Sequence, residues 1–209
     1  MHIYAFGSLC RGQVDLESDV DLLAIVDGHD DRFDPSKFSI YSYKRVREIW
    51  QEGNPFAWHL CLEAKMLFSE NGDDFLRHLG SPSQYSNCLA DCKRFFRLFE
   101  DAAASLNTDA RSTIFDLSTL FLSIRNFSTC YSLGKSSRPD FSRHAALSMR
   151  TFPAPLKPEF HRVIERARIL CTRGYGTAIT APEVSVVRQS LAIVHEWMES
   201  TIGEFDVSS

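Results

Sequence analysis

The sequence predicts an α/β protein of the α+β type, in which a small mixed sheet with helices is followed by an all-α helical bundle. Two observations support this prediction. Through the first 80 residues, short runs rich in Val, Ile and aromatic residues alternate with polar loops, as in a sheet. From about residue 83 onward, apolar residues instead recur at helical spacing. We therefore predict two domains, at residues 1–80 and 81–209.

The first part reads in order as strand, loop, strand, loop, strand, two helices and a strand. HIYAF at residues 2–6 and DVDLLAIV at residues 19–26 are the first two strands, because both are short, apolar and bounded by polar loops. KFSIYSY at residues 37–43 is the third strand, and Asp34 before a proline reads as a turn. Residues 53–68 supply a helix that leads into the last strand.

The second part is predicted to hold about five helices. The first carries Cys88, Cys92 and Phe99 on one face, and burial explains its cysteines better than chemistry. Gly134 is expected to end the second helix as a left-handed cap, and Gly174 to end the fourth. The run Thr180–Glu183 reads as a capping box that opens the fifth. The second to fourth helices are predicted at residues 113–133, 141–150 and 158–173.

Arg125 lies in the middle of the otherwise apolar run DLSTLFLSIRNF. A buried guanidinium without an anion is costly, so Arg125 needs a negatively charged partner. Asp116 on the same helix or a substrate phosphate could serve. We prefer a structural ion pair with Asp116.

Two aspartates lie inside the second predicted strand. Because strand side chains alternate between faces, Asp19 and Asp21 project from the same face, whereas Val20 points into the core. Adjacent carboxylates repel each other at neutral pH, and a divalent cation between them removes the repulsion. The pattern therefore indicates a hard-metal site, although a solvated strand entrance would have a similar sequence.

The first strand ends at Gly7 and Ser8. A residue without a Cβ lets backbone N–H groups approach an anion closely, and Ser8 adds a hydroxyl donor, so this turn suits a phosphate. Arg11 shares the loop that leads to Asp19 and is placed to bind a triphosphate. Together with the two aspartates, the turn predicts a site for a metal-bound polyphosphate.

Gly7-Ser8, a polar segment and then Ser18-Asp19-Val20-Asp21 before an apolar strand resemble the signature of the DNA polymerase β-like nucleotidyltransferase superfamily. The likeness is greatest to its small bacterial members, the minimal and the aminoglycoside nucleotidyltransferases, the latter of which also carry a helical domain. It is strong over about residues 3–26 and weaker over residues 53–68.

The resemblance implies an enzyme that uses Mg²⁺ and transfers a nucleoside monophosphate from ATP or another nucleoside triphosphate. The acceptor would be a hydroxyl of a small molecule or protein, and pyrophosphate would leave. Asp19 and Asp21 would hold the metal and act in catalysis. The nucleotide would be bound by Gly7, Ser8, Arg11 and Ser18.

Members of this superfamily usually carry a third carboxylate on a later strand, and KFSIYSY contains none. Asp34 and Glu63 could substitute only if the fold brings one of them near the two strand aspartates. Glu63 is our candidate catalytic base, but it also reads as a helix partner of His59, four residues earlier. The missing acid leaves an alternative: a weak or inactive nucleotide-binding regulator, similar to an antitoxin, that binds a protein partner.

Composition bounds the partners and the compartment. The chain has 209 residues, 44% of them hydrophobic and 24% charged, as in a globular protein. Its net charge of −4 argues against a general nucleic-acid partner, and its apolar runs are too short to span a membrane. Six scattered cysteines without a CxxC pair read as reduced core residues, and no secretory signal is visible, so we expect a cytoplasmic protein. A homodimer stays open.

Overall fold

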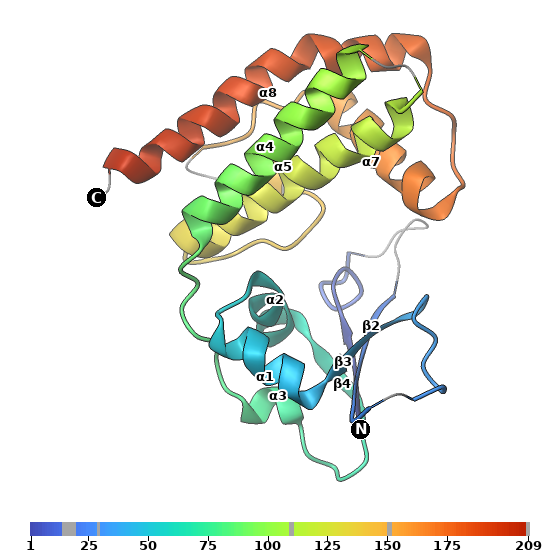
Figure 1. The fold of residues 1–209 in the computed structure, drawn as a ribbon, viewed down its shortest axis with the longest axis vertical. Helices are drawn as coiled ribbons and strands as arrows, with labels where there is room; N and C mark the ends of the chain where they lie inside the picture. The colour runs from blue at the N-terminus through green and yellow to red at the C-terminus, as the bar shows by residue number, and fades with distance from the viewer. Residues whose placement is uncertain (14–19, 29, 109–110, 150–151, 208–209) are drawn as a thin grey trace. The chain divides into compact units, whose positions relative to one another are not determined.

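The computed structural model describes residues 1–13, 20–28, 30–108, 111–149 and 152–207. The chain divides into two compact units, Met1–Ser86 and Asn87–Ser209. The first contains the sheet with short helices and the second contains long helices (Figure 1). This arrangement confirms the predicted fold class. The domain boundary after residue 80 stays a prediction, because compactness alone does not show that either part folds independently.

The first unit contains a four-stranded mixed sheet in the order β3-β2-β1-β4. β1 runs antiparallel to both β2 and β4, and β3 runs parallel to β2. In the register of β1 and β2, Phe6 lies opposite Asp21, so the end of β1 and the start of β2 meet at one end of the sheet. The strands are β1 His2–Phe6, β2 Asp21–Val26, β3 Phe38–Ser42 and β4 Lys65–Ser69.

Within its described residues this unit has three helices: α1 Tyr43–Gln51, α2 Pro55–Glu63 and α3 Phe75–His78. The hydroxyl of Ser42 caps α1 by accepting a hydrogen bond from the N–H of Arg45 at 3.1 Å. The side chain of Asn54 caps α2 in the same way, accepting from the N–H of Phe56 at 2.9 Å. A proline occupies the first position of α2, where a missing N–H costs nothing.

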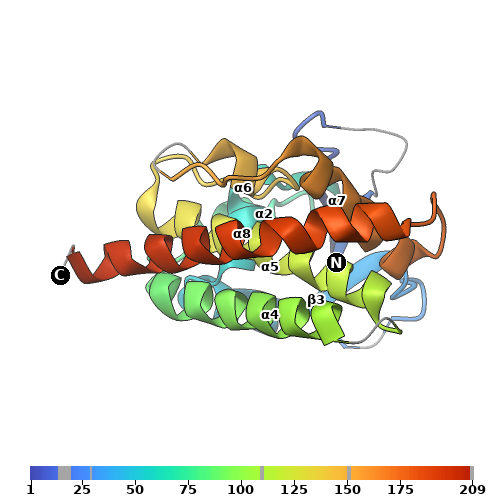
Figure 2. The ribbon, with the colours of Figure 1, turned by 90° about the horizontal axis from the view of Figure 1, so that it is seen from above.

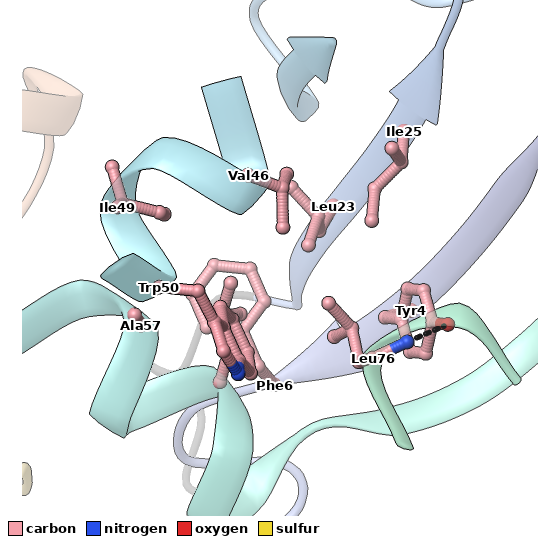
Figure 3. Packing of buried hydrophobic residues seen from close by; sticks show 10 residues of the cluster. Tyr4, Phe6, Leu23, Ile25, Val46, Ile49, Trp50, Ala57 and Leu76 are labelled. Atoms are coloured by element: carbon pink, nitrogen blue, oxygen red, sulfur yellow. Dashed lines mark hydrogen bonds between the residues drawn. The ribbon is translucent and has the colours of Figure 1, made fainter. Parts of the chain in front are cut away.

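The main core of the first unit lies between the helices and one face of the sheet (Figure 3). The buried phenol of Tyr4 belongs to this core, and its hydroxyl accepts from the N–H of Leu76 at 3.1 Å and donates to Asp74 Oδ1 at 3.0 Å. Burial raises the pKa of Tyr4, so the phenol stays neutral. The buried members are Tyr4, Phe6, Leu23, Ile25, Val46, Ile49, Trp50, Ala57, Leu60 and Leu76.

The other face of the sheet carries a smaller cluster around Ala24, Val26 and Phe33. Val20 does not join either core: it precedes β2 and is 55% exposed. The prediction that Val20 points into the core was therefore wrong. The physical reason is that the pairing with β1 extends only as far as Asp21, so no neighbouring strand covers the preceding residue.

The second unit is built from helices. α5 packs against α4, α6 and α7, and α8 packs against α4 and α7 (Figures 1 and 2). The indole of Trp197 on α8 also contacts the ring of Phe127 on α5, with ring centroids 5.5 Å apart. The helices are α4 Cys88–Thr108, α5 Thr113–Lys135, α6 Ala145–Ser148, α7 Pro158–Arg173 and α8 Ala181–Val207.

α5 is buried on several sides, although its sequence is not uniformly apolar. The hydroxyls of Ser123, Ser128 and Ser132 are buried and donate to backbone carbonyls three or four residues earlier in the same helix, at 2.9 to 3.0 Å. A helix can bury serine in this way because its own carbonyls satisfy the hydroxyl. α5 is therefore the central helix of this unit.

Two predicted helix ends are confirmed. α7 spans the predicted residues and ends at Gly174, whose φ of 70° is left-handed, a conformation that glycine adopts without a Cβ clash. At the start of α8, the carboxylate of Glu183 accepts from the backbone N–H of Thr180 at 2.8 Å and from its hydroxyl at 2.9 Å. This is the return half of the predicted capping box.

Two other predicted helix features were wrong. Gly134 does not end α5, which continues to Lys135; the N–H of Ser136 still bonds to the carbonyl of Ser132 at 2.9 Å. The helix predicted at residues 141–150 shrinks to α6. Its first residues form side-chain turns instead, because Asp140 Oδ1 accepts from the N–H of Ser142 at 2.7 Å and Ser142 Oγ accepts from the N–H of His144 at 3.1 Å.

The predicted ion pair between Asp116 and Arg125 was also wrong. Nine residues separate them, which places them about 13.5 Å apart along the helix axis and on opposite sides of it. The Arg125 guanidinium instead donates to the carbonyls of Phe141 at 2.5 Å and Ser142 at 3.4 Å. Asp116 accepts from the hydroxyl of Ser112 at 2.6 Å. The Arg125 guanidinium is thus bonded to backbone carbonyls of the segment after α5 and not to Asp116.

The cysteines divide between core and surface. Cys88, Cys92 and Cys130 are buried, as predicted, and the thiols of Cys88 and Cys92 lie against backbone carbonyls of α5. Cys61 and Cys171 are exposed, so the prediction of core cysteines was wrong for these two. Within the described ranges, none of the helices combines the length and the apolar character that a membrane span requires.

Candidate functional site

The turn after β1 starts at Gly7, whose φ of 74° lies in the left-handed region. Its carbonyl accepts from the N–H groups of Cys10 at 3.1 Å and Arg11 at 3.2 Å, and the carbonyl of Ser8 accepts from the N–H of Gln13 at 3.0 Å. The chain therefore coils tightly immediately after the strand. The turn keeps Ser8 and Arg11 close to the end of the sheet.

Asp21 lies against this turn. A Cβ built on Gly7 would be 2.2 Å from Asp21 Oδ2, closer than any real contact, so the carboxylate occupies the space that the missing side chain leaves. The pairing of Phe6 with Asp21 places both residues on one face at the end of the sheet. Glycine at position 7 is thus required twice, for its backbone conformation and for the approach of the carboxylate.

Asp19 and Ser18 lie outside the described residues, so their predicted roles stay predictions. Among the residues that are described, no three His, Cys, Asp or Glu side chains come together as a metal-binding group. Asp21 itself fits a hard cation such as Mg²⁺, because carboxylate oxygens are the ligands that such ions prefer. The predicted partner of Asp21 is Asp19.

Glu63 lies at the end of α2 and contacts the turn after β1. Its Oε2 accepts from Arg11 Nη1 at 2.5 Å and from His59 Nε2 at 2.9 Å, and the three side chains are 12 to 19% exposed. The predicted helix pairing of His59 with Glu63 is therefore confirmed. The contact with Arg11 was not predicted. Glu63 was expected to act as the base and Arg11 to bind phosphate, but the two side chains bind each other.

No acid of β3 approaches Asp21. In the parallel pairing, Ser39 lies beside Leu23, two residues along β2 from Asp21, at the position where an acid on β3 would share the face of Asp21. Asp34 is a turn residue, as predicted: Oδ1 accepts from the N–H of Ser36 at 2.9 Å and from its hydroxyl at 2.8 Å. These hydrogen bonds hold the pKa of the Asp34 carboxyl below its usual range.

A recess of about 470 Å³ adjoins Asp21 where β2 and β3 begin. Sequence reasoning missed this feature, because Ser36, Lys37 and Ser39 carry no motif and reach Asp21 only through the pairing of β2 with β3. The lining residues are Val20, Asp21, Leu22, Pro35, Ser36, Lys37, Phe38 and Ser39.

Cys10 lies in the turn between Gly7 and Arg11. Burial raises the pKa of its thiol, so Cys10 is protonated at neutral pH and is not a thiolate nucleophile. The polar groups that the turn can offer to a ligand are therefore the Ser8 hydroxyl and the Arg11 guanidinium, with the backbone of Gly7 and Ser8.

The sheet end thus brings together a tight glycine turn, a hydroxyl, a guanidinium and a strand carboxylate, the groups of a protein that binds a metal-bound polyphosphate. Residues 2–79 match the family model described as nucleotidyltransferase domain. The first unit therefore contains a nucleotidyltransferase domain, consistent with the polymerase β-like superfamily that the sequence resembles. No curated protein and no solved structure was found that matches the chain.

The match over residues 2–79 supports nucleotidyl transfer as the general function of this domain. Domains of this family typically use a divalent metal ion.

Proposed function

We propose that the protein transfers a nucleoside monophosphate from ATP or another nucleoside triphosphate to a hydroxyl of a small molecule or protein, with release of pyrophosphate. The observation that carries the proposal is the fit of the Asp21 carboxylate into the space left by Gly7. This fit joins a carboxylate to a phosphate-type turn at the end of the sheet.

In this proposal Asp21 and Asp19 hold Mg²⁺, which when bound neutralises charge on the phosphates and on the leaving oxygen. The backbone of Gly7 and Ser8 and the hydroxyl of Ser8 bind phosphate oxygens, together with Ser18. Arg11 adds a positive charge at the same turn. The protein's contribution is mainly to position these groups, as in other phosphoryl-group chemistry.

The test is Asp21→Asn, with Mg·ATP binding measured by calorimetry. We expect binding to be lost, because a neutral amide replaces a metal ligand. The melting temperature should stay the same or rise slightly, because repulsion with Asp19 is removed. Asp27→Asn, an exposed aspartate just after the other end of β2, is the matched control and should bind as the wild type does. If Asp21→Asn binds Mg·ATP as tightly as the wild type, the proposal is wrong.

A second candidate is a nucleotide-binding regulator that binds a protein partner and turns over slowly or not at all. Two observations favour it: β3 offers Ser39 where an acid would face the site, and the Glu63 carboxylate is already bound by Arg11 and His59. The two candidates differ in pyrophosphate release. Nucleotide binding without release, for every hydroxyl acceptor tried, would favour the regulator.

A further inference from the structure

The turn that carries the proposed phosphate-binding groups is tied to α2 by a chain of three polar side chains. His59 Nε2 contacts Glu63 Oε2 at 2.9 Å, and the same oxygen accepts from Arg11 Nη1 at 2.5 Å. Since a carboxylate only accepts, the proton of this contact is assigned to Nε2 of His59. The His59 ring is itself fixed by an edge contact with Phe6, with ring centroids 5.5 Å apart.

Arg11 has donors left after these contacts. Its guanidinium carries five N–H groups, of which one on Nε is donated to Gln13 Oε1 at 2.9 Å and one on Nη1 to Glu63. Among the described residues, the remaining three N–H groups have no acceptor. The guanidinium is planar, and the two bonds that it makes fix the orientation of this plane beside the turn formed by Gly7 and Ser8.

From this geometry we infer that Glu63 is a positioning residue that orients the Arg11 guanidinium toward the phosphates, and is not the catalytic base. The inference rests on the proposed function. A base would have to turn toward an acceptor hydroxyl and give up its contact with Arg11. A carboxylate that orients Arg11 keeps this contact and does not have to move. Holding a long side chain in place matters here because a free arginine loses rotamer entropy when it binds a ligand, whereas an arginine that is already held loses less.

Binding of the triphosphate end separates the two roles without knowledge of the acceptor. A base touches the acceptor hydroxyl, so its removal leaves phosphate affinity unchanged. A residue that acts through Arg11 changes phosphate affinity, and does so only while Arg11 is present. The probe is magnesium pyrophosphate, since this product is common to nucleotidyl transfers from any nucleoside triphosphate.

The experiment is a double-mutant cycle on the full chain, with Glu63→Gln, Arg11→Met and the double variant, measured by calorimetry at about 0.5 M salt to screen the change in net charge. We expect Glu63→Gln to weaken pyrophosphate binding roughly 10-fold and to have no further effect in the Arg11→Met background. Glu63→Asp, which keeps the charge but shortens the reach, should weaken binding as Glu63→Gln does.

Glu48→Gln is the matched control, because Glu48 on α1 also accepts from an arginine, Arg45, at 3.2 Å but lies in an exposed pair. It should leave binding unchanged. Melting temperatures of all variants identify any loss of fold. If Glu63→Gln does not fold, the pyrophosphate affinity of Glu63→Asp decides the test in its place. Unchanged or tighter binding by Glu63→Gln, or an equal loss with and without Arg11, would overturn the inference. If the wild type itself does not bind magnesium pyrophosphate, both this inference and the proposed function are wrong.

Discussion

Gly7 shows at the scale of one residue how the fold builds the candidate site. Its place at the end of the first strand predicts a role in phosphate binding, because a residue without a Cβ lets backbone N–H groups approach an anion. The structure adds a second requirement that only the pairing of β1 with β2 reveals: Asp21 Oδ2 occupies the place of the missing side chain. The need for glycine at position 7 was therefore predictable from the sequence, but its contact with the Asp21 carboxylate was not.

Gly7→Ala should disturb the site more than the same change five residues later. Gly7 and Gly12 have similar φ values, 74° and 70°, so alanine meets the same backbone strain at both. Only at Gly7 does the new Cβ meet a carboxylate, whereas nothing lies within 4 Å of a Cβ at Gly12. We expect Gly7→Ala to abolish Mg·ATP binding, and Gly12→Ala to retain it with a stability loss of about 1 kcal/mol from its left-handed backbone. Equal affinities of the two variants in calorimetry would show that the turn is merely structural.

At the scale of the element, helix ends were predictable where they depend on a few adjacent residues. Gly174 and the run from Thr180 to Glu183 act within one turn of chain, and both were predicted correctly. Gly134 has the same local signal as Gly174, yet α5 passes through it. Glycine permits a left-handed cap but does not impose one. By contrast, the ion pair between Glu63 at the end of α2 and Arg11 in the turn after β1 spans 52 residues of sequence and leaves no local signal.

The start of α8 should make stability depend on pH. The Arg166 guanidinium, with the N–H and hydroxyl of Thr180, lowers the pKa of Glu183 to about 2. A lowered pKa in the folded state stabilises the protein above the ordinary pKa of about 4.5 and loses this effect as pH falls toward 2. Thermal unfolding of Glu183→Gln should thus lie below that of the wild type at pH 7, with the gap closing toward pH 2. A gap that is constant with pH would contradict this assignment.

At the scale of the whole molecule, each unit has buried apolar residues of its own. In the second unit, large side chains such as Phe99, Phe127 and Phe160 are fully buried and lie on helices that pack against one another. The sequence anticipated this division from the change of apolar spacing near residue 83. It could not identify the central helix, because the burial of α5 depends on which helices surround it.

A chain of residues 87–209 alone should therefore fold. We expect the helical circular dichroism of this unit and a single cooperative thermal transition, because its core residues come from its own helices. Noncooperative melting of the isolated segment would show that residues 1–86 are needed to complete its core.

The burial of α5 determines how its backbone exchanges hydrogen with water. Along its middle, from Leu117 to Ser132, most residues are buried, and the hydroxyls of Ser123, Ser128 and Ser132 are bonded to carbonyls of the helix itself. Fraying of one turn cannot admit solvent there while α4 and α7 stay packed against it. Exchange of these amides requires the surrounding helices to separate, so their rates report the global unfolding free energy of this unit, whereas amides at the ends of α4 and α8 report local opening.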